Sequence, residues 1–133
     1  MAKRAVNPWT WQDAIGFSQG VVVPGAGRTL YLAGQVACDG EGVPLCVGDM
    51  AGQTRKALEN IATVLQQAGF ALQDIVRLNI YTTDVEQFHR HGSPLIKQVL
   101  AGIPHASTLL GVARLASPDF LIELEATAVA AAA

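Results

Sequence analysis

Two carboxylates near the end of the chain have the spacing needed to act on the same face of a strand. Glu123 and Glu125 alternate with apolar residues within 120–129, and side chains two residues apart on a strand point the same way. Such a pair needs a cation or water beside it, and Arg77, on the polar side of an earlier strand, is the candidate partner. The pattern fits acid–base chemistry or a structural ion pair, and composition alone favours the ion pair.

Ser107 and His105 are a second pair that could share a strand face, which makes a contact between them conceivable. A serine–histidine relay also needs a third member, and none is apparent. His89 and His91, two residues apart at the start of an expected helix, do not share a helix face, so we expect surface histidines and no metal site there. Neither a phosphate-binding glycine loop nor a Gly-x-Ser-x-Gly motif occurs, so no cofactor is indicated.

The elements that must position these residues follow from hydrophobic periodicity. The pattern predicts strands over 18–23, 29–36, 75–82, 107–113 and 120–129, and helices after Asp49 and over 88–100. A Pro-Gly turn at 24–27 predicts that the first two strands form a hairpin. We expect Asp49 and Gly69 to cap the first helix, and Pro94 to lie in the first turn of the second.

The order β-β-α-β-α-β-β predicts an α+β fold, with a mixed sheet and both helices on one of its faces. In the last strand the core face is apolar throughout. In the third strand we place Val76, Leu78 and Ile80 on the core face, and Ile75, Arg77, Asn79 and Tyr81 on the helix-free face. Because that second face mixes polar and large apolar residues, we interpret it as a partly buried subunit interface; a solvated face is the alternative.

Composition limits the possible partners. The 133 residues fit one domain, 1–133, with an ordered core over about 14–129. Half of the residues are hydrophobic and only 15% are charged, which favours burial against other subunits. A net charge of −2 and the lack of a long apolar run indicate no nucleic-acid partner, no membrane and a cytoplasmic protein. In that compartment Cys38 and Cys46 are expected to be free thiols.

Several segments resemble a known family in their order and spacing. They are LYLAGQV at 30–36, QT at 53–54, ALENI at 57–61, VL at 64–65, AG at 68–69, YTTD at 81–84, VARL at 112–115 and IELEA at 122–126. Together they resemble the RidA/YjgF family, and the similarity runs from about Gly16 to Val129. The resemblance implies a chorismate-mutase-like (YjgF-type) fold and a homotrimer with a cleft between each pair of subunits.

The resemblance also implies an activity, the hydrolysis of 2-enamine or 2-imine acids to 2-keto acids and ammonia, without a metal or an organic cofactor. Glu123 matches the glutamate that positions or activates the water in such enzymes. Backbone groups around Gly34 would line the cleft. The expected partner is therefore a small-molecule substrate or ligand.

The chain departs from the family pattern where deaminating members hold the substrate. Ser107 stands at the position of the arginine that binds the substrate carboxylate through two hydrogen bonds. Leu109 replaces a cysteine, and Phe17 replaces a tyrosine. Losing the bidentate contact should cost roughly 1.5–3 kcal/mol in carboxylate binding. Arg77 and a protonated His105 are options for holding an anion instead, and Arg114 is another.

Three functions remain open on the sequence. The first is a divergent imine or enamine deaminase that uses Glu123 for water activation. The second is a non-catalytic trimer that binds a small molecule in the same cleft. The third is a structural or partner-binding role. The residues predicted to contact the ligand are Ser107, Phe17, Gly34, His105, Leu109 and Arg77.

Overall fold

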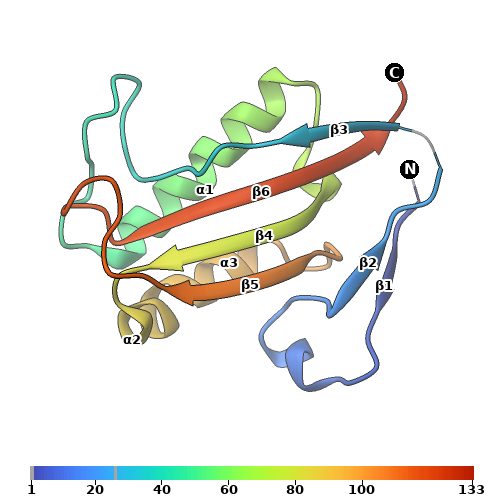
Figure 1. Cartoon of the computed structure of the whole chain (residues 1–133), viewed down its shortest axis with the longest axis horizontal. Helices are drawn as coiled ribbons and strands as arrows, with labels where there is room; N and C mark the ends of the chain where they lie inside the picture. The colour runs from blue at the N-terminus through green and yellow to red at the C-terminus, as the bar shows by residue number, and fades with distance from the viewer. Residues whose placement is uncertain (1, 26) are drawn as a thin grey trace.

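The computed structural model describes residues 2–25 and 27–133 and shows a mixed four-stranded sheet with its helices on one face (Figure 1). The strand order is β3 (Gly27–Tyr31), β6 (Ile122–Ala131), β4 (Ile75–Thr82) and β5 (Ala106–Gly111). β6 is antiparallel to both neighbours, whereas β4 and β5 are parallel. The predicted α+β architecture is confirmed.

The helices have the predicted end signals. α1 (Met50–Gln67) begins after Asp49, whose carboxylate accepts a hydrogen bond from the backbone N–H of Gly52 at 3.0 Å. Gly69 follows its end with a φ of +79°. The second expected helix is three consecutive segments, α2 (Val85–Gln87), the π-helix η3 (Phe88–Gly92) and α3 (Ser93–Val99), with Pro94 in the first turn of α3. Two short 3₁₀ helices, η1 (Trp11–Ala14) and η2 (Leu72–Asp74), complete the helical elements of the described chain.

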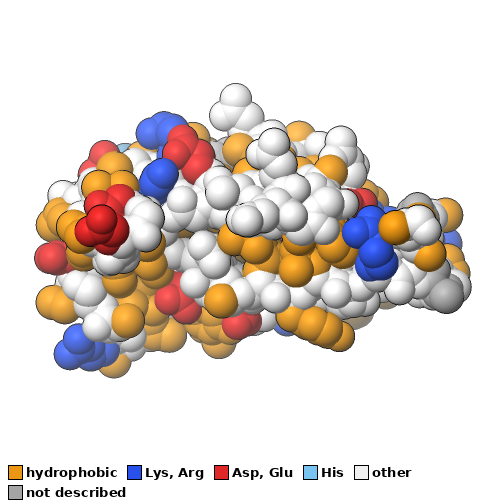
Figure 2. Space-filling view, turned by 90° about the horizontal axis from the view of Figure 1, so that it is seen from above, with side chains coloured by type: hydrophobic (Ala, Val, Ile, Leu, Met, Phe, Trp, Pro, Cys, Tyr) orange, Lys and Arg blue, Asp and Glu red, His pale blue; other side chains and the backbone are white. Residues whose placement is uncertain are grey.

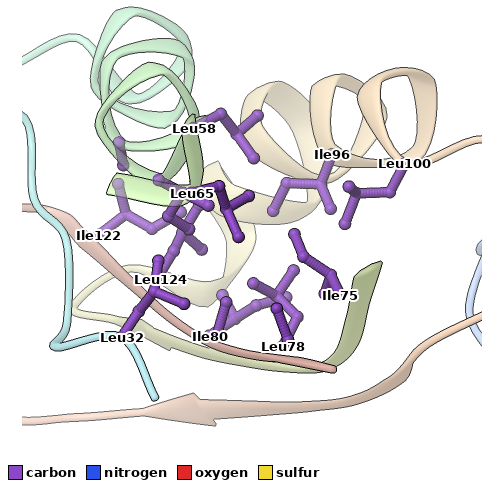
Figure 3. Packing of buried hydrophobic residues seen from close by; sticks show 14 of the residues in the cluster. Leu32, Leu58, Leu65, Ile75, Leu78, Ile80, Ile96, Leu100, Ile122 and Leu124 are labelled. Carbon is purple, nitrogen blue, oxygen red and sulfur yellow. The ribbon is translucent and has the colours of Figure 1, made fainter. Parts of the chain in front are cut away.

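The core lies between the sheet and the helices α1 and α3 (Figure 3). Its centre is formed by branched aliphatic side chains from both layers: Leu58, Leu65, Ile96, Leu100, Leu78, Ile80, Ile122 and Leu124. All of them are buried, so burial of apolar surface fixes which face of the sheet the helices cover.

The predicted hairpin between the first two strands is wrong. β2 (Gly20–Val22) pairs with an N-terminal strand, β1 (Arg4–Val6), in a separate two-stranded sheet, while β3 pairs with β6. Residues 4–6 were not predicted to form an element. The pairing of β3 with β6 sets Leu30 beside the buried Ala128, an apolar contact that a local hairpin would not make.

The predicted position of Ile75 on the helix-free face is also wrong. The register between β4 and β6 shifts by one residue between Ile75 and Arg77, which leaves Val76 as an inserted residue. A one-residue bulge reverses the alternation of side chains. Ile75 is therefore buried in the core together with Leu78.

Candidate functional site

Ser107 and Leu109 point to the helix-covered side of the sheet. β5 pairs with β4 in parallel, with Leu78 beside Ser107 and Ile80 beside Leu109. Neighbouring residues in such a register face the same way. The edge strand β5 thus directs both side chains toward α3.

These side chains line a cavity of about 450 Å³ between β5, α3 and the N-terminal segment. Four of the predicted ligand-binding residues meet in it: Phe17, His105, Ser107 and Leu109. Phe17 reaches the cavity because the backbone N–H of Ser18 donates to the carbonyl of His105 at 2.8 Å. That bond ties the N-terminal segment to the start of β5, where β1 and β2 lie in Figure 1.

His105 is a buried group in the cavity lining. Only 2% of it is exposed, and its Nδ1 lies 2.8 Å from the carbonyl oxygen of Ile103. Burial lowers the pKa of His105, and the positive charge of Lys3 lowers the pKa further, against the opposing effect of the bond to Ile103. The imidazole is therefore neutral at pH 7, and Nδ1 donates its proton to that carbonyl. The described contacts contain no hydrogen bond between His105 and Ser107, so no relay is formed.

Glu123 and Gly34 meet at a different place, on the helix-free face. Glu123 lies opposite Tyr81 in the β4–β6 register. Both residues alternate with core residues along their strands, so their side chains face away from the helices. A Cβ atom on Gly34 would lie 2.6 Å from the carboxyl carbon of Glu123, so only glycine leaves room for this side chain. Between Tyr31 and Gln35 the register with β6 shifts by one residue, and this irregularity brings Gly34 against the carboxylate.

The helix-free face holds a network around Glu125. One oxygen of Glu125 accepts hydrogen bonds from Asn79 at 3.0 Å and from the Tyr81 hydroxyl at 3.1 Å. The hydrogen bond from Tyr81 to Glu125, together with burial and the neighbouring carboxylates, raises the pKa of Tyr81. Burial, and then the charge of Glu125, raises the pKa of Glu123. Glu123 thus holds a proton more tightly than an ordinary glutamate.

Arg77 does not pair with either glutamate. Its guanidinium donates to the Thr108 hydroxyl at 2.7 Å, and it is not among the residues around the cavity. In the described part of the chain the only ion pair is Lys56 with Glu59, at 3.7 Å. The predicted structural ion pair with Arg77 is therefore wrong, and among the described residues the two carboxylates have no cation paired with them.

Sequence reasoning predicted none of the cavity residues on the second helical segment, which are Phe88, His89, Ser93, Pro94, Ile96 and Lys97. His89 and Lys97 both lie at the exposed rim. His89 is on the π-helix η3, whose wider turn is not encoded in a 3.6-residue periodicity. Lys97 donates from Nζ to the carbonyl of Ala14 at 2.7 Å, which closes the N-terminal segment onto α3. Residue type alone gave no signal for either position.

Other chemistry has little support in the described residues. They contain no cluster of three or more histidine, cysteine or acidic side chains that could hold a metal ion. Cys38 and Cys46 are both free, as expected. Among the described helices, none combines the length and the apolarity required to cross a bilayer.

The chain is thus an α+β protein with a cavity on the helix-covered side of its sheet and a glutamate cluster on the other face. A family model described as Endoribonuclease L-PSP matches residues 11–130. A RutC family protein of Pyrococcus abyssi is 32% identical over 129 residues, which are 96% of this chain and 98% of the relative. A crystal structure from Yersinia pestis, a Rid family protein of unknown function, is 36% identical with a TM-score of 0.88, and the match covers 98% of this chain and 100% of that one.

The chain therefore belongs to the RidA/YjgF family. The human 2-iminobutanoate/2-iminopropanoate deaminase is similar to it at 29% identity over 90 residues, which are 67% of this chain and 64% of the human protein.

Proposed function

We propose that this chain is an imine or enamine hydrolase whose active site is completed by a second subunit of a homotrimer. One observation carries the proposal: the residues expected to form the site lie in two groups, on opposite faces of the sheet. The cavity holds Phe17, His105, Ser107 and Leu109. Glu123 lies on the helix-free face, outside that cavity. A neighbouring copy that presents its Glu123 to this cavity would join the two groups.

The chemistry needs few groups, because the carbon of a C=N bond is already electrophilic. An ionised Glu123 accepts a proton from water while the water oxygen bonds to that carbon. The same carboxyl returns the proton to nitrogen, which gives a carbinolamine. It then takes the hydroxyl proton and passes it to nitrogen, and the C–N bond breaks as the C=O bond forms, so that ammonia leaves a carbonyl product. A glutamate whose pKa is raised by burial is suited to both steps, since the best acid–base groups have a pKa near the working pH.

The name of the human relative, a 2-imino acid deaminase, supports this reaction class. The description Endoribonuclease L-PSP points instead to RNA. RNA binding draws its affinity from basic side chains against phosphates, whereas this chain has a net charge of −2 and carries an acidic pair on its helix-free face. On the side seen in Figure 2, the basic residues are separated by hydrophobic and acidic ones. These features favour a small metabolite, and they also fit a cytoplasmic protein that does not bind nucleic acid.

A non-catalytic ligand-binding trimer is the second candidate. It is favoured by one feature, the mainly apolar lining of the cavity, where Ile80, Phe88 and Ile96 surround the ligand space. Such a cavity can hold a molecule without acting on it. The two candidate functions are distinguished by measuring turnover: replacing Glu123 should abolish it in a hydrolase, whereas a binding protein shows no turnover to lose.

A mixing experiment tests the shared site. Glu123→Gln removes the acid–base group, and Leu109→Trp fills the cavity of its own subunit. Each variant alone should lose ammonia release from imines generated in place with amino acid and amine oxidases. A cleft works when an intact cavity, from a Glu123→Gln subunit, meets an intact Glu123, from a Leu109→Trp subunit. In trimers reassembled at random from equal amounts of the two variants, about one quarter of the clefts meet this condition. Activity should therefore return to roughly one quarter of the wild-type value.

Light scattering should show a trimer for the wild type and for both variants. Mixtures that stay inactive although they form mixed trimers would contradict the shared site. A wild-type trimer that releases no ammonia from any imine would leave the binding role as the surviving candidate.

A further inference from the structure

The deep part of the cavity offers no positive charge to a ligand. Of the described residues around it, those nearest the sheet are Ser107 and His105 on β5 and its approach, with Ile80 and Leu109 beside them. His105 is buried, and its ring is committed to the carbonyl of Ile103. The hydroxyl of Ser107 is left as the group that can donate a hydrogen bond to a ligand.

The cationic side chain at the rim is engaged with the protein itself. Lys97 donates from Nζ to the backbone carbonyl of Ala14 at 2.7 Å. Its Cγ lies 2.9 Å from where a Cβ on Gly16 would be, so the aliphatic stem packs against the N-terminal segment and forms part of the wall. The ammonium thus holds the segment closed at the exposed edge of the cavity.

Apolar side chains line the cavity from every element around it, with His89, Ser93 and Lys97 as the polar residues of the helical side. Phe88 and Ile96 come from the helical layer, Phe17 from the N-terminal segment, and Leu109 from β5. A carboxylate placed among them would lose its hydration without gaining a charged partner, which is strongly unfavourable. An uncharged group with one polar atom meets no such penalty.

We propose that this cavity takes an uncharged imine or enamine of an aldehyde or ketone, not a 2-imino acid. This inference rests on the proposed hydrolase function and names its substrate class. The apolar substituent packs against Phe17, Phe88 and Leu109, and the nitrogen or the product oxygen bonds to the Ser107 hydroxyl. One imine and one water give one aldehyde or ketone and one ammonia: water oxygen bonds to carbon, the C–N bond breaks, and both water protons end on ammonia.

A matched pair of product-like ligands tests the charge preference directly. 4-Phenylbutan-2-one and 2-oxo-4-phenylbutanoate share the same phenylethyl ketone and differ by a methyl group in place of a carboxylate. Titration calorimetry on the full-length wild type should give a Kd for the ketone at least about tenfold lower than for the oxo acid. Ser107→Arg adds a cation at the floor and should reverse this order.

Gln66→Arg is the control, because it adds the same charge on the exposed side of α1; it should leave the wild-type preference unchanged. If the wild type binds the oxo acid as tightly as the ketone, or binds neither, the inference is wrong. Turnover is measured separately on the two corresponding imines, made in place from homophenylalanine and from 4-phenylbutan-2-amine. Ketone binding without turnover of either imine would refute the hydrolase function and leave the ligand class standing, whereas turnover of the imino acid alone would refute the ligand class and keep the function.

Discussion

Gln53 should contribute more to stability than any other polar side chain on α1, because it joins the helix to the segment that leads into β6. It is fully buried, its amide nitrogen donates to the carbonyl of Asp119 at 2.8 Å and to that of Cys46 at 3.3 Å, and its amide oxygen accepts from the N–H of Leu121 at 2.8 Å. Leu121 directly precedes β6, which carries Glu123. The same side chain therefore supports both the fold and the placement of the glutamate.

Gln53→Leu keeps the size of the side chain and removes all three bonds. The two short bonds serve backbone groups that are partly buried, and each group left unpaired costs about 1–3 kcal/mol. We expect the free energy of unfolding to fall by about 2–4 kcal/mol, which lowers Tm by roughly 10 °C for a chain of this size. Denaturant unfolding followed by circular dichroism measures the change.

Gln66→Leu is the matched control, the same replacement at an exposed position of α1, and should stay within about 0.5 kcal/mol of wild type. Gln53→Glu adds a second check, because a carboxylate cannot donate to Asp119 but a protonated carboxyl can. Its stability should recover relative to wild type as the pH is lowered. A Gln53→Leu variant as stable as the Gln66 control would refute the reasoning.

Further predictions concern pH and packing. The raised pKa of Glu123 means that the folded chain binds this proton more tightly than the unfolded chain does. The stability of the wild type should therefore fall as the pH rises above the ordinary pKa of 4.5. In parallel thermal melts, Glu123→Gln should be more stable relative to wild type at pH 8 than at pH 4. The lowered pKa of His105 has the opposite sense: stability falls as pH drops below the ordinary 6.5, and His105→Asn should show a shallower loss of Tm between pH 7 and pH 5. A Cβ on Gly92 would lie 2.6 Å from a ring carbon of Phe88, so Gly92→Ala should lower the free energy of unfolding in urea by about 1–3 kcal/mol. Gly40→Ala is the control, because Gly40 has open space around it, and it should cause no such loss. Equal losses in the two variants would exclude steric overlap as the cause.

Local signals predicted the elements that are defined by their own sequence. α1 was predictable from its apolar stripe and from Asp49 and Gly69 at its ends. The last strand was predictable because its alternation runs unbroken from Phe120 to Ala128, with every second residue buried. In both cases the periodicity of one segment is enough to define the face that is buried.

Features that depend on distant segments were not predictable in this way. The bulge at Val76 reverses the face of Ile75, and no residue in the strand itself marks the insertion. The partner of β2 depends on a three-residue strand too short to show alternation. For the site, periodicity assigned Glu123 to the helix-free face, but the face of Ser107 depends on the parallel register of β5 with β4. That Ser107 and Glu123 lie on opposite faces of the sheet therefore became apparent only in the three-dimensional structure.

Two of the hydrogen bonds that hold the N-terminal wall of the cavity use main-chain atoms of that wall. Ser18 is fixed through its N–H to the carbonyl of His105, and Ala14 through its carbonyl to Lys97. Neither bond uses the side chain of Ile15 or Phe17, which both line the cavity. Replacing Ile15 or Phe17 therefore leaves both bonds available, which makes these two positions suited to the evolution or the engineering of new ligand preferences.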